Sequence, residues 1–241
     1  MSADFPLTHP YFAYILAPPT PLRRAKFQHL RRYVQGGAVL DLGCGESGLY
    51  WALGYVSDID RLHLADVNPQ FVATIRQQID LLDPLLLEAA FGATLAWLGT
   101  LAEGLPHTAA FAERLLDALA PPTVIDMLRP FADAAYDTII SLEAVECVAD
   151  ATAFLTALRH SYAALRPGGV LVGDLLRYAE PDAIVQELIA QGLEGQVNPD
   201  AAQLHTALQV AGFDAITMAQ DHTSGAGNRA TCLFYTARRP R

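Results

Sequence analysis

Carboxylates and glycines gather where apolar runs of this sequence end. The first run, residues 38–42, leads into a glycine-rich stretch at 43–48, and Asp41 precedes the first glycine by two residues. Glycines let the backbone approach a ligand closely, and a helix that starts there directs its positive end to the same place. The glycine spacing alone fits a dinucleotide loop, but a carboxylate at Asp41 repels a pyrophosphate and attracts a cation. The stretch therefore indicates a ligand that carries positive charge.

A second carboxylate, Asp66, closes the apolar run at residues 61–65. An acid at this place in nucleotide-binding folds accepts the hydroxyls of a ribose. The alternative is a helix N-cap for the segment that starts at Asn68-Pro69. Position 66 is therefore a candidate ribose site.

Three further carboxylates follow later runs. Glu143 and Glu146 come after the run at 136–141, and Asp174 ends the run at 170–174. A helical turn would place Glu143 and Glu146 on one face, so the three could converge beside a reacting group. Such a pocket would attract an amine and raise the proton affinity of its own carboxylates. The alternative is that the glutamates cap a helix or face solvent.

The elements that must position these residues alternate along the chain. Helical patterns separate the apolar runs, and two last runs, 213–219 and 230–237, flank a turn-rich segment. This alternation predicts a parallel sheet covered on both faces, with an antiparallel hairpin at one edge. Ligands of such sheets bind at the carboxyl ends of the strands. We expect one domain over residues 1–241, with lid helices at 1–37 and a helical insertion or cap at 82–121.

Composition excludes several classes of function. The 241 residues hold 16 basic and 26 acidic side chains, a net charge of −10, and Lys26 is the one lysine. Nucleic-acid binding depends on Lys and Arg, so DNA, RNA and anionic membranes are poor partners. Three scattered cysteines lack zinc-site spacing, which favours a reducing, cytoplasmic setting without a bound metal, and no run of about 18 apolar residues predicts a membrane span. Monomer and homodimer both remain open.

Several segments together resemble class I S-adenosylmethionine-dependent methyltransferases. AVLDLGCGESG and Asp66 resemble that family's first two motifs, and VIDML, YDTIIS and LRPGGVLV resemble its third, fourth and fifth strand segments. The match covers most of residues 38–174. It implies a Rossmann-like α/β class I methyltransferase fold, with a mostly parallel seven-stranded sheet and a C-terminal antiparallel hairpin. It also implies S-adenosyl-L-methionine as cofactor, S-adenosyl-L-homocysteine as product, and a small-molecule acceptor.

Weaker details resemble the nicotinamide and phenylethanolamine N-methyltransferase group. They are Tyr11 and Tyr14 in the expected lid, Tyr50 after the glycine loop, the helical insertion, SLEAVECV and the ending DHTSGAGNRATCLFYTARR. Glu46-Ser47-Gly48 and the prolines at 18–21 depart from that group. The resemblance implies methylation of an amine or heteroaromatic nitrogen. SLEAV stands where an Asn/Asp-Pro-Pro-aromatic motif would follow the fourth strand, which disfavours nucleic-acid substrates further.

The resemblance and the strand-end positions assign roles to individual residues. Asp126 and Met127 are expected to flank adenine, and Cys44 to be a packing residue. An oxygen or carbon acceptor is the alternative, with Glu146 or His222 as base; a catalytically silent scaffold and an aminopropyl transferase are further alternatives. Trp51, Trp97, Phe91 and Phe111 are expected in the core or cap rather than around the substrate. The expected cofactor residues are Tyr11, Tyr14, Asp41, Gly43, Gly45, Tyr50, Asp66, Asn68, Asp126, Met127 and Ser141; Tyr178 and His222 are expected at the substrate, and Glu143, Glu146 and Asp174 in catalysis.

Overall fold

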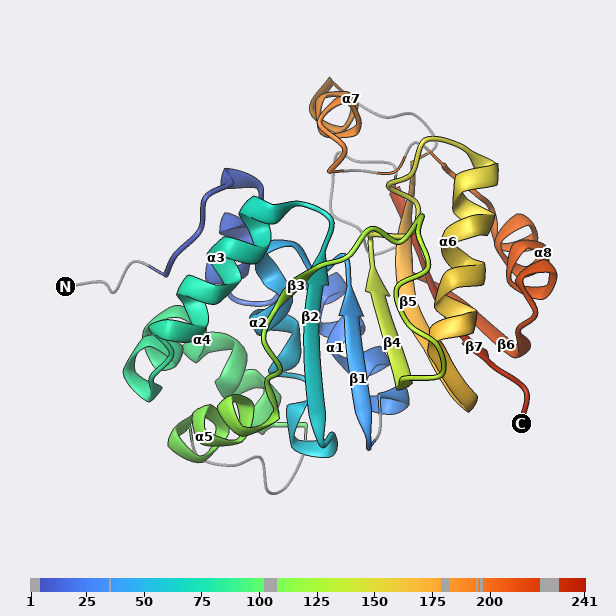
Figure 1. Ribbon diagram of the computed structural model, residues 1–241. Coiled ribbons are helices and arrows are strands. Elements are labelled where there is room, and N and C mark those ends of the chain that lie inside the picture. Colours follow the sequence, from blue (N-terminus) through green and yellow to red (C-terminus); the bar gives the residue numbers. More distant parts are fainter. Residues whose placement is uncertain are drawn as a thin grey trace.

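Seven strands form one sheet in the order β3-β2-β1-β4-β5-β7-β6 (Figure 1). The computed structural model describes residues 5–34, 36–101, 108–178, 183–193, 195, 197–221 and 230–241. Neighbours from β3 to β5 pair in parallel, and β7 pairs antiparallel with both β5 and β6. The strands are β1 Ala38–Leu42, β2 Arg61–Asp66, β3 Thr123–Val124, β4 Tyr136–Leu142, β5 Leu165–Tyr178, β6 Asp214–Asp221 and β7 Ala230–Arg238. The mostly parallel seven-stranded sheet with a C-terminal antiparallel hairpin is confirmed.

Helices fill the connections, and several begin at the residues that the sequence marks. Asn68 caps α3 by accepting the backbone N–H of Gln70 at 2.9 Å, with Pro69 in the first turn. The helices are η1 Pro10–Leu16, α1 Pro21–Tyr33, η2 Gly45–Ser47, α2 Gly48–Ala52, η3 Val56–Asp58, α3 Pro69–Asp80, α4 Pro84–Gly99, α5 Thr108–Ala118, α6 Ala151–Ala164, α7 Ala183–Ala190 and α8 Ala201–Ala211.

Alternate residues of the central strands face two different apolar layers. In β1, Val39 packs in the layer formed with α1, α2, α4 and α5, whereas Leu40 packs in the layer formed with α6 and α8. Ile140 and Ile139 of β4 divide in the same way. Because both faces are covered, the inner residues of these strands are mostly apolar on both sides. This is why they read as continuous hydrophobic runs in the sequence.

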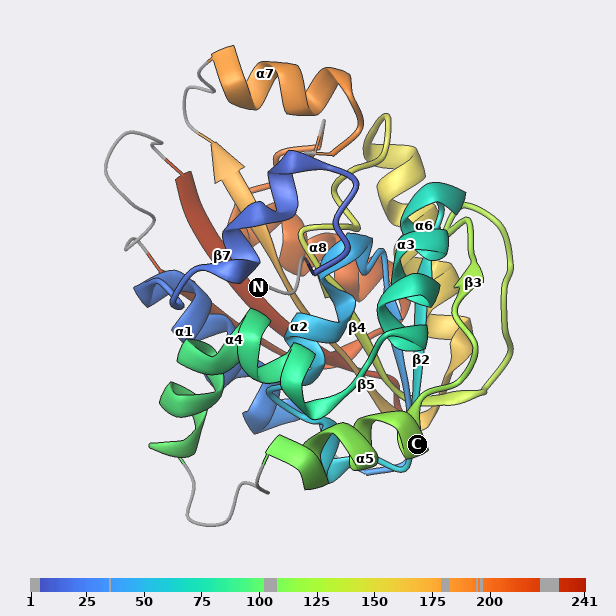
Figure 2. The same ribbon diagram turned by 90° about the vertical axis from the view of Figure 1, so that its left-hand side faces the viewer.

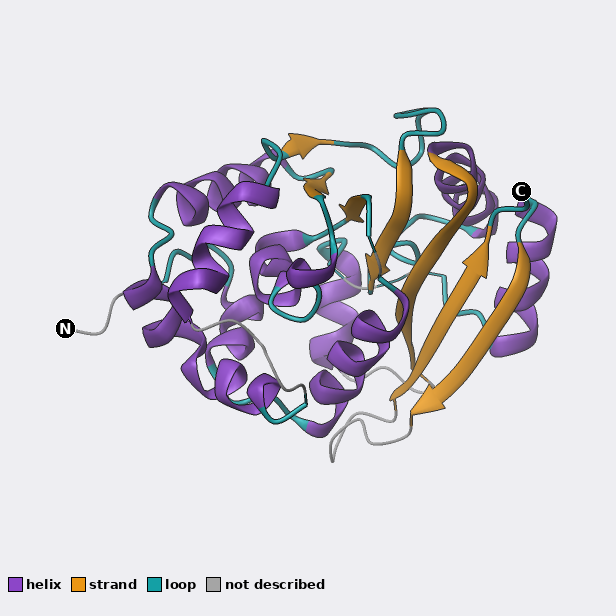
Figure 3. Ribbon diagram, turned by 90° about the horizontal axis from the view of Figure 1, so that it is seen from below, coloured by secondary structure: helices purple, strands orange, loops and turns teal. Residues whose placement is uncertain are grey.

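The order of the strands fixes where a ligand can bind. β1 pairs with β2 on one side and with β4 on the other. The chain therefore continues from β1 toward one edge of the sheet and from β4 toward the opposite edge. At such a switch point the carboxyl ends of the strands border an open crevice. Figure 1 shows these ends pointing toward η1 and α7, and Figure 3 shows the long strands of the antiparallel end from below.

Three segments differ from the elements that the sequence predicts. The third strand is two residues long, because only Thr123 and Val124 pair with β2. β5 continues to Tyr178, because its pairing with β7 runs from Val170 to Tyr178. Residues 143–150 form turns rather than a helix, so Glu143 and Glu146 do not share a helical face.

The helical insertion does not cap the cavity described below. Phe91 of α4 and Phe111 of α5 are buried in the layer against the sheet, and the two helices lie away from the carboxyl ends of the strands (Figures 1 and 2). α4 buries Leu87 and Phe91 in this layer and leaves its opposite face, including Leu85, exposed to solvent. Within the described residues no single helix could cross a membrane; α3 and α4 pass that test only as a pair bent by 113°.

Candidate active site

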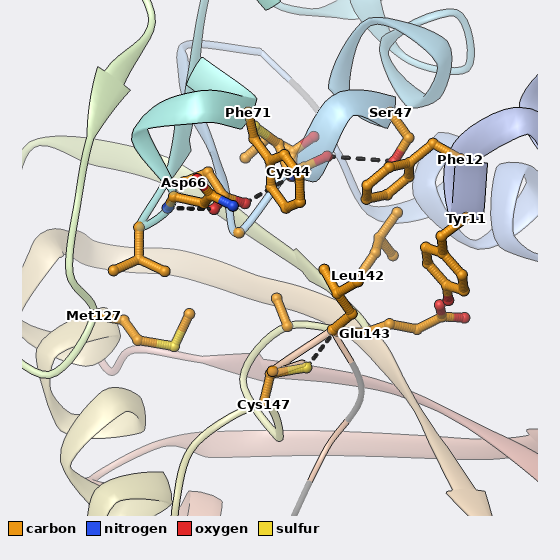
Figure 4. A pocket seen from close by; sticks show the side chains of 18 of the residues that line it. Tyr11, Phe12, Cys44, Ser47, Asp66, Phe71, Met127, Leu142, Glu143 and Cys147 are labelled. Carbon is orange, nitrogen blue, oxygen red and sulfur yellow. Dashed lines mark hydrogen bonds between the residues drawn. The ribbon is translucent and has the colours of Figure 1, made fainter. Parts of the chain in front are cut away.

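A cavity of about 580 Å³ opens at the carboxyl ends of β1, β2 and β4. Its size is ordinary for a small-molecule site. The residues in its wall that the sequence singles out as site residues are Tyr11, Tyr14, Asp41, Gly43, Gly45, Asp66, Asn68, Asp126, Met127 and Glu143. Figure 4 shows Asp66 on one side of the cavity, Met127 below it, and Tyr11 with Glu143 on the opposite side. The topology thus brings residues more than a hundred positions apart to one enclosure.

The glycine loop after β1 needs its glycines for two separate reasons. Gly43 and Gly45 have φ angles of +77° and +55°, a backbone region that side chains rarely adopt. A Cβ on Gly45 would also lie 2.7 Å from Cζ of Phe12, so this residue lies directly against the segment that covers the loop. The backbone N–H groups of Gly43 and Cys44 donate to the Ala65 carbonyl, which ties the loop to β2.

Asp66 stands at the end of β2 with both carboxylate oxygens facing backbone donors. Oδ2 accepts the N–H of Gly45 at 2.9 Å and Oδ1 accepts the N–H of Asn68 at 2.8 Å. Each oxygen retains a second lone pair that could accept a ligand hydroxyl. Burial raises the pKa of Asp66 despite these donors. Asn68, not Asp66, is the N-cap of α3, so the capping alternative for Asp66 is wrong.

Asp41 is a buried acid in the cavity wall, with 1% of its surface exposed. Its Oδ2 lies 3.5 Å from the hydroxyl of Tyr55. Burial, and then the neighbouring Asp66 carboxylate, raise the pKa of Asp41 to about 8. A cation beside Asp41 would offset both effects, so the position suits a ligand ammonium.

Asp126 and Met127 follow β3 and face the loop from the other side. Asp126 accepts the Leu128 N–H at 2.9 Å and lies 3.4 Å from Nε of Arg129, and its side chain is 39% exposed. Cε of Met127 lies 3.7 Å from the position that a Cβ on Gly43 would take. Met127 therefore packs directly against the glycine loop, and its thioether adds an apolar surface to the cavity wall.

The segment that covers the cavity is fixed at both ends. At its start, the buried Glu46 carboxylate accepts the backbone N–H groups of Thr8 at 2.8 Å and His9 at 3.2 Å. At its end, the Arg23 guanidinium donates to the carbonyls of Tyr14 and Pro18, both at 2.7 Å. We call residues 8–18 the lid. Its inner face presents Tyr11, Phe12 and Tyr14 to the cavity.

The rest of the expected N-terminal lid has a structural role. Phe5 and Ile15 are buried in the core, and α1 packs on the sheet, where Nε2 of His29 lies 3.1 Å from the Tyr235 carbonyl oxygen. The lid helices expected at residues 1–37 are therefore partly wrong, since only residues 8–18 cover the cavity. Deletion of residues 1–20 would open the core as well as the cavity.

Lys26, which sequence reasoning left out of the site, stands between two of the expected catalytic acids. Its ammonium pairs with Glu143 and lies 2.7 Å from Oδ2 of Asp174. Burial alone would lower the pKa of Lys26, but Asp174 and Glu143 raise it above its ordinary value. We call Lys26, Glu143 and Asp174 the ion-pair cluster. Lys26 and Glu143 line the cavity, and the fully buried Asp174 stands behind them.

The expected convergence of three carboxylates is wrong for Glu146, because only Glu143 and Asp174 meet, at Lys26. Glu146 is fully buried, lies outside the cavity wall, and accepts the N–H of Leu176 at 3.3 Å. Glu143 has a φ of +49°, and its N–H donates to the Asp174 carbonyl. This left-handed turn separates the two glutamates. It directs Glu143 toward Tyr11, as Figure 4 shows. Glu146 is instead buried beside β5, where it meets the Leu176 N–H.

Other expected site residues lie away from the cavity. Tyr50 is fully buried among core rings, with its hydroxyl 3.4 Å from Nη1 of Arg23. Ser141 is buried within β4, and Tyr178 at the end of β5 exchanges hydrogen bonds with Asn198. His222 lies outside the described residues. Trp51, expected in the core, packs there and also reaches the cavity wall.

Several solved structures have an architecture similar to that of this chain. The carbon methyltransferase CurJ matches with a TM-score of 0.56 and 14% identity, over 86% of this chain and 49% of that one. Phosphoethanolamine N-methyltransferase 2 of Haemonchus contortus, solved with S-adenosyl-L-methionine, matches with a TM-score of 0.58 and 14% identity, over 95% and 56%. The chain has the class I methyltransferase fold. It spans about half the length of both proteins.

The same fold also serves another reaction class. The [4+2]-cyclase SpnF matches with a TM-score of 0.58 and 18% identity, over 90% of this chain and 81% of that one. No protein-family model and no curated protein matches the sequence. The fold is thus established, and the chemistry has to be argued from the cavity.

Proposed function

We propose that this chain transfers a methyl group from S-adenosyl-L-methionine to a small molecule. The observation that carries the proposal is one enclosure with two chemically different ends. Asp66, Asp41 and the glycine loop form one end, and Tyr11, Lys26 and Glu143 form the other. Two reactants held side by side gain most of their rate from orientation, about 7–11 kcal/mol in favourable cases.

The residues at the first end fit the cofactor. The open lone pairs of Asp66 suit ribose hydroxyls, the buried Asp41 suits the ammonium of the amino acid part, and Met127 suits the face of adenine. When bound, the cofactor supplies an electrophilic methyl group on a sulfonium. The chain binds and orients, and the lid excludes water.

The acceptor atom is a finer part of the proposal. The sequence favours the nitrogen of an amine or heteroaromatic ring, with oxygen or carbon as the alternative. Lys26 bears on this choice because it places a cation beside Glu143, where an amine would otherwise be held. This observation supports the oxygen acceptor. Among the residues that could serve as base, it also favours Glu143 over the fully buried Glu146.

Calorimetry and label transfer test the proposal. Titration with S-adenosyl-L-homocysteine should give one binding site per chain, and Asp66→Ala should lower the affinity of that site. Cofactor with a labelled methyl group, incubated with the protein and a library of small phenols, enols and amines, should yield a labelled product found by mass spectrometry. Failure to bind S-adenosyl-L-homocysteine would overturn the proposal. Cofactor binding with no methylated product from any acceptor class would instead support a silent scaffold or a cyclase-like role.

A further inference from the structure

The ion-pair cluster presents a positive and a negative group side by side at the acceptor end of the cavity. The Lys26 side chain comes from α1 and is 4% exposed, whereas Glu143 follows β4 and is 19% exposed. Asp174, with no exposure, holds Lys26 from behind at 2.7 Å and also accepts the Cys232 thiol at 3.0 Å. Asp174 is thus a positioning residue for Lys26, and the two other members meet the ligand.

This arrangement disfavours a cationic acceptor. Any ammonium that reached Glu143 would lie beside the ammonium of Lys26, which already pairs with that carboxylate. Two like charges a few ångströms apart repel strongly where water is excluded.

The arrangement favours an acceptor that delivers a proton and leaves an anion. The Glu143 carboxylate is held by Lys26 and by a hydrogen bond from Tyr11, and burial raises its pKa above the ordinary value. A carboxylate in this position can accept a proton from a bound hydroxyl. If Glu143 takes a proton, Lys26 keeps Asp174 and gains room for one anionic oxygen. The net charge of the buried group then stays constant, so no isolated charge is created.

The walls around the ion-pair cluster are aromatic. The ring of Trp51 lies 5.7 Å from Nζ of Lys26, and Tyr11 and Tyr14 face the same space. Flat apolar walls suit a conjugated ring. A hydroxyl on such a system is acidic enough for a carboxylate base of raised pKa to share its proton.

We propose that the methyl acceptor is a phenol or enol, with Glu143 as the base and Lys26 as the residue that holds the oxyanion. This rests on the proposed methyl transfer. The acceptor O–H bond breaks, its proton goes to a Glu143 oxygen, and its electron pair stays on the acceptor oxygen beside Lys26. That pair forms the new C–O bond while the C–S bond breaks, with the electrons of the C–S bond left on sulfur. Glu143 later releases its proton to water.

A coloured phenol tests the anion site without turnover. 4-Nitrophenol is titrated with pH in the presence of protein and S-adenosyl-L-homocysteine, and absorbance reports its ionised fraction. Wild-type protein should lower the apparent pKa of the bound dye by about one unit or more, a tenfold preference for the phenolate. Lys26→Met should abolish that shift, and Lys26→Arg should retain most of it. Arg24→Met, which removes a charge from the exposed face of the same helix, should leave the shift unchanged.

Benzylamine tests the opposite case, an acceptor that carries a positive charge. It should bind wild-type protein at least tenfold more weakly than 4-nitrophenol, and Lys26→Met should narrow that gap by tenfold or more. Wild-type protein that prefers benzylamine, that binds neither compound, or that leaves the dye pKa unshifted overturns the proposal. If Lys26→Met fails to fold, Glu143→Gln tests the proposal instead. This variant should still lower the pKa of the bound dye. It should no longer accept the acceptor's proton, so its turnover should rise with the acidity of the phenol.

Cofactor binding distinguishes a failure of the proposed methyl transfer from a failure of the acceptor assignment. S-adenosyl-L-homocysteine should bind wild type, Lys26→Met and Glu143→Gln with equal affinity, since neither residue lies at the cofactor end. Loss of that binding in wild type contradicts the proposed function. Intact binding without a phenolate preference contradicts the acceptor assignment alone.

Discussion

The carboxylate of Glu46 accepts the backbone N–H of Thr8 at 2.8 Å, across 38 residues of sequence. It thereby fastens the start of the lid to the helical turn that ends the glycine loop. Gln78 adds a second tie, with its Nε2 donating to the Pro6 carbonyl at 2.8 Å and to the Glu46 carbonyl at 3.1 Å. The lid and the glycine loop are therefore held together as one unit.

Replacement of Glu46 should release the lid. Glu46→Ala removes a buried charged acceptor from two backbone donors, and we expect a loss of about 1.5–3 kcal/mol in the free energy of unfolding or in local lid stability. Limited proteolysis within residues 8–18 should accelerate, and turnover should fall because water enters. Glu113→Ala, on an exposed position of α5, is the control. Equal proteolysis rates in the two variants would contradict a clamp at Glu46.

Two glycines separate backbone strain from steric contact. Gly36 and Gly45 have nearly equal φ angles, +54° and +55°, but a Cβ on Gly36 meets nothing within 4 Å. Gly36→Ala should cost about 1–2 kcal/mol in urea unfolding, the usual penalty for a left-handed side chain. Gly45→Ala should cost about 1–3 kcal/mol more, because Phe12 must move. Equal losses would show that the lid does not press on the loop.

Asp66→Ala should weaken the binding of S-adenosyl-L-homocysteine by about 1.5–3 kcal/mol, measured by calorimetry, because a charge-assisted pair of hydrogen bonds is lost. Asp66→Asn keeps one acceptor oxygen for the loop and should lose less. Asp60→Ala, just before β2 and exposed, should bind like wild type. Unchanged affinity in Asp66→Ala would remove Asp66 from the ribose site.

Asp41 should make the ligand-free protein less stable as pH rises. Its folded pKa of about 8 lies above the ordinary 3.8, so between these values the folded chain holds a proton that the unfolded chain has released. The contribution is present at low pH and is lost as pH rises toward 8. Asp41→Asn has no such term. The unfolding free energy of Asp41→Asn relative to wild type should therefore rise by about 1.4 kcal/mol per pH unit over this window. A pH-independent difference would contradict the shift, and Asp60→Asn serves as the surface control.

The strands and the glycine-loop end of the cavity were predictable because they depend on short-range pattern. Burial on both faces makes Leu40, Leu62 and Leu64 apolar in the runs at 38–42 and 61–65. Gly43, Gly45 and Asp66 follow these runs. Topology then places these strand ends together without further information. β3 was predicted too long because its last residues, including Asp126 and Met127, leave the sheet for the cavity wall.

The acceptor end was less predictable because it depends on tertiary contacts. Glu143 and Glu146 have helical spacing, but the turn at Glu143 and the buried hydrogen bond of Glu146 to Leu176 send them apart. One signal for Lys26 was present: it falls on the buried stripe of α1 with Arg23, Phe27 and Leu30, at spacings of three and four residues. A charged residue on such a stripe requires a buried partner, and the partner is 148 residues away in Asp174.

The solitary lysine gives the protein a built-in chemical reporter. Reagents that acylate amines have one side-chain target in this sequence, Lys26, and it is 3% exposed under the lid. Its rate of acylation therefore measures how often the cavity opens, read as the mass increment on the peptide that contains Lys26, apart from any acylation of the N-terminal amine. Slow acylation in wild type, fast acylation in Glu46→Ala, and protection by a bound acceptor would turn one residue into a direct measure of traffic into the site.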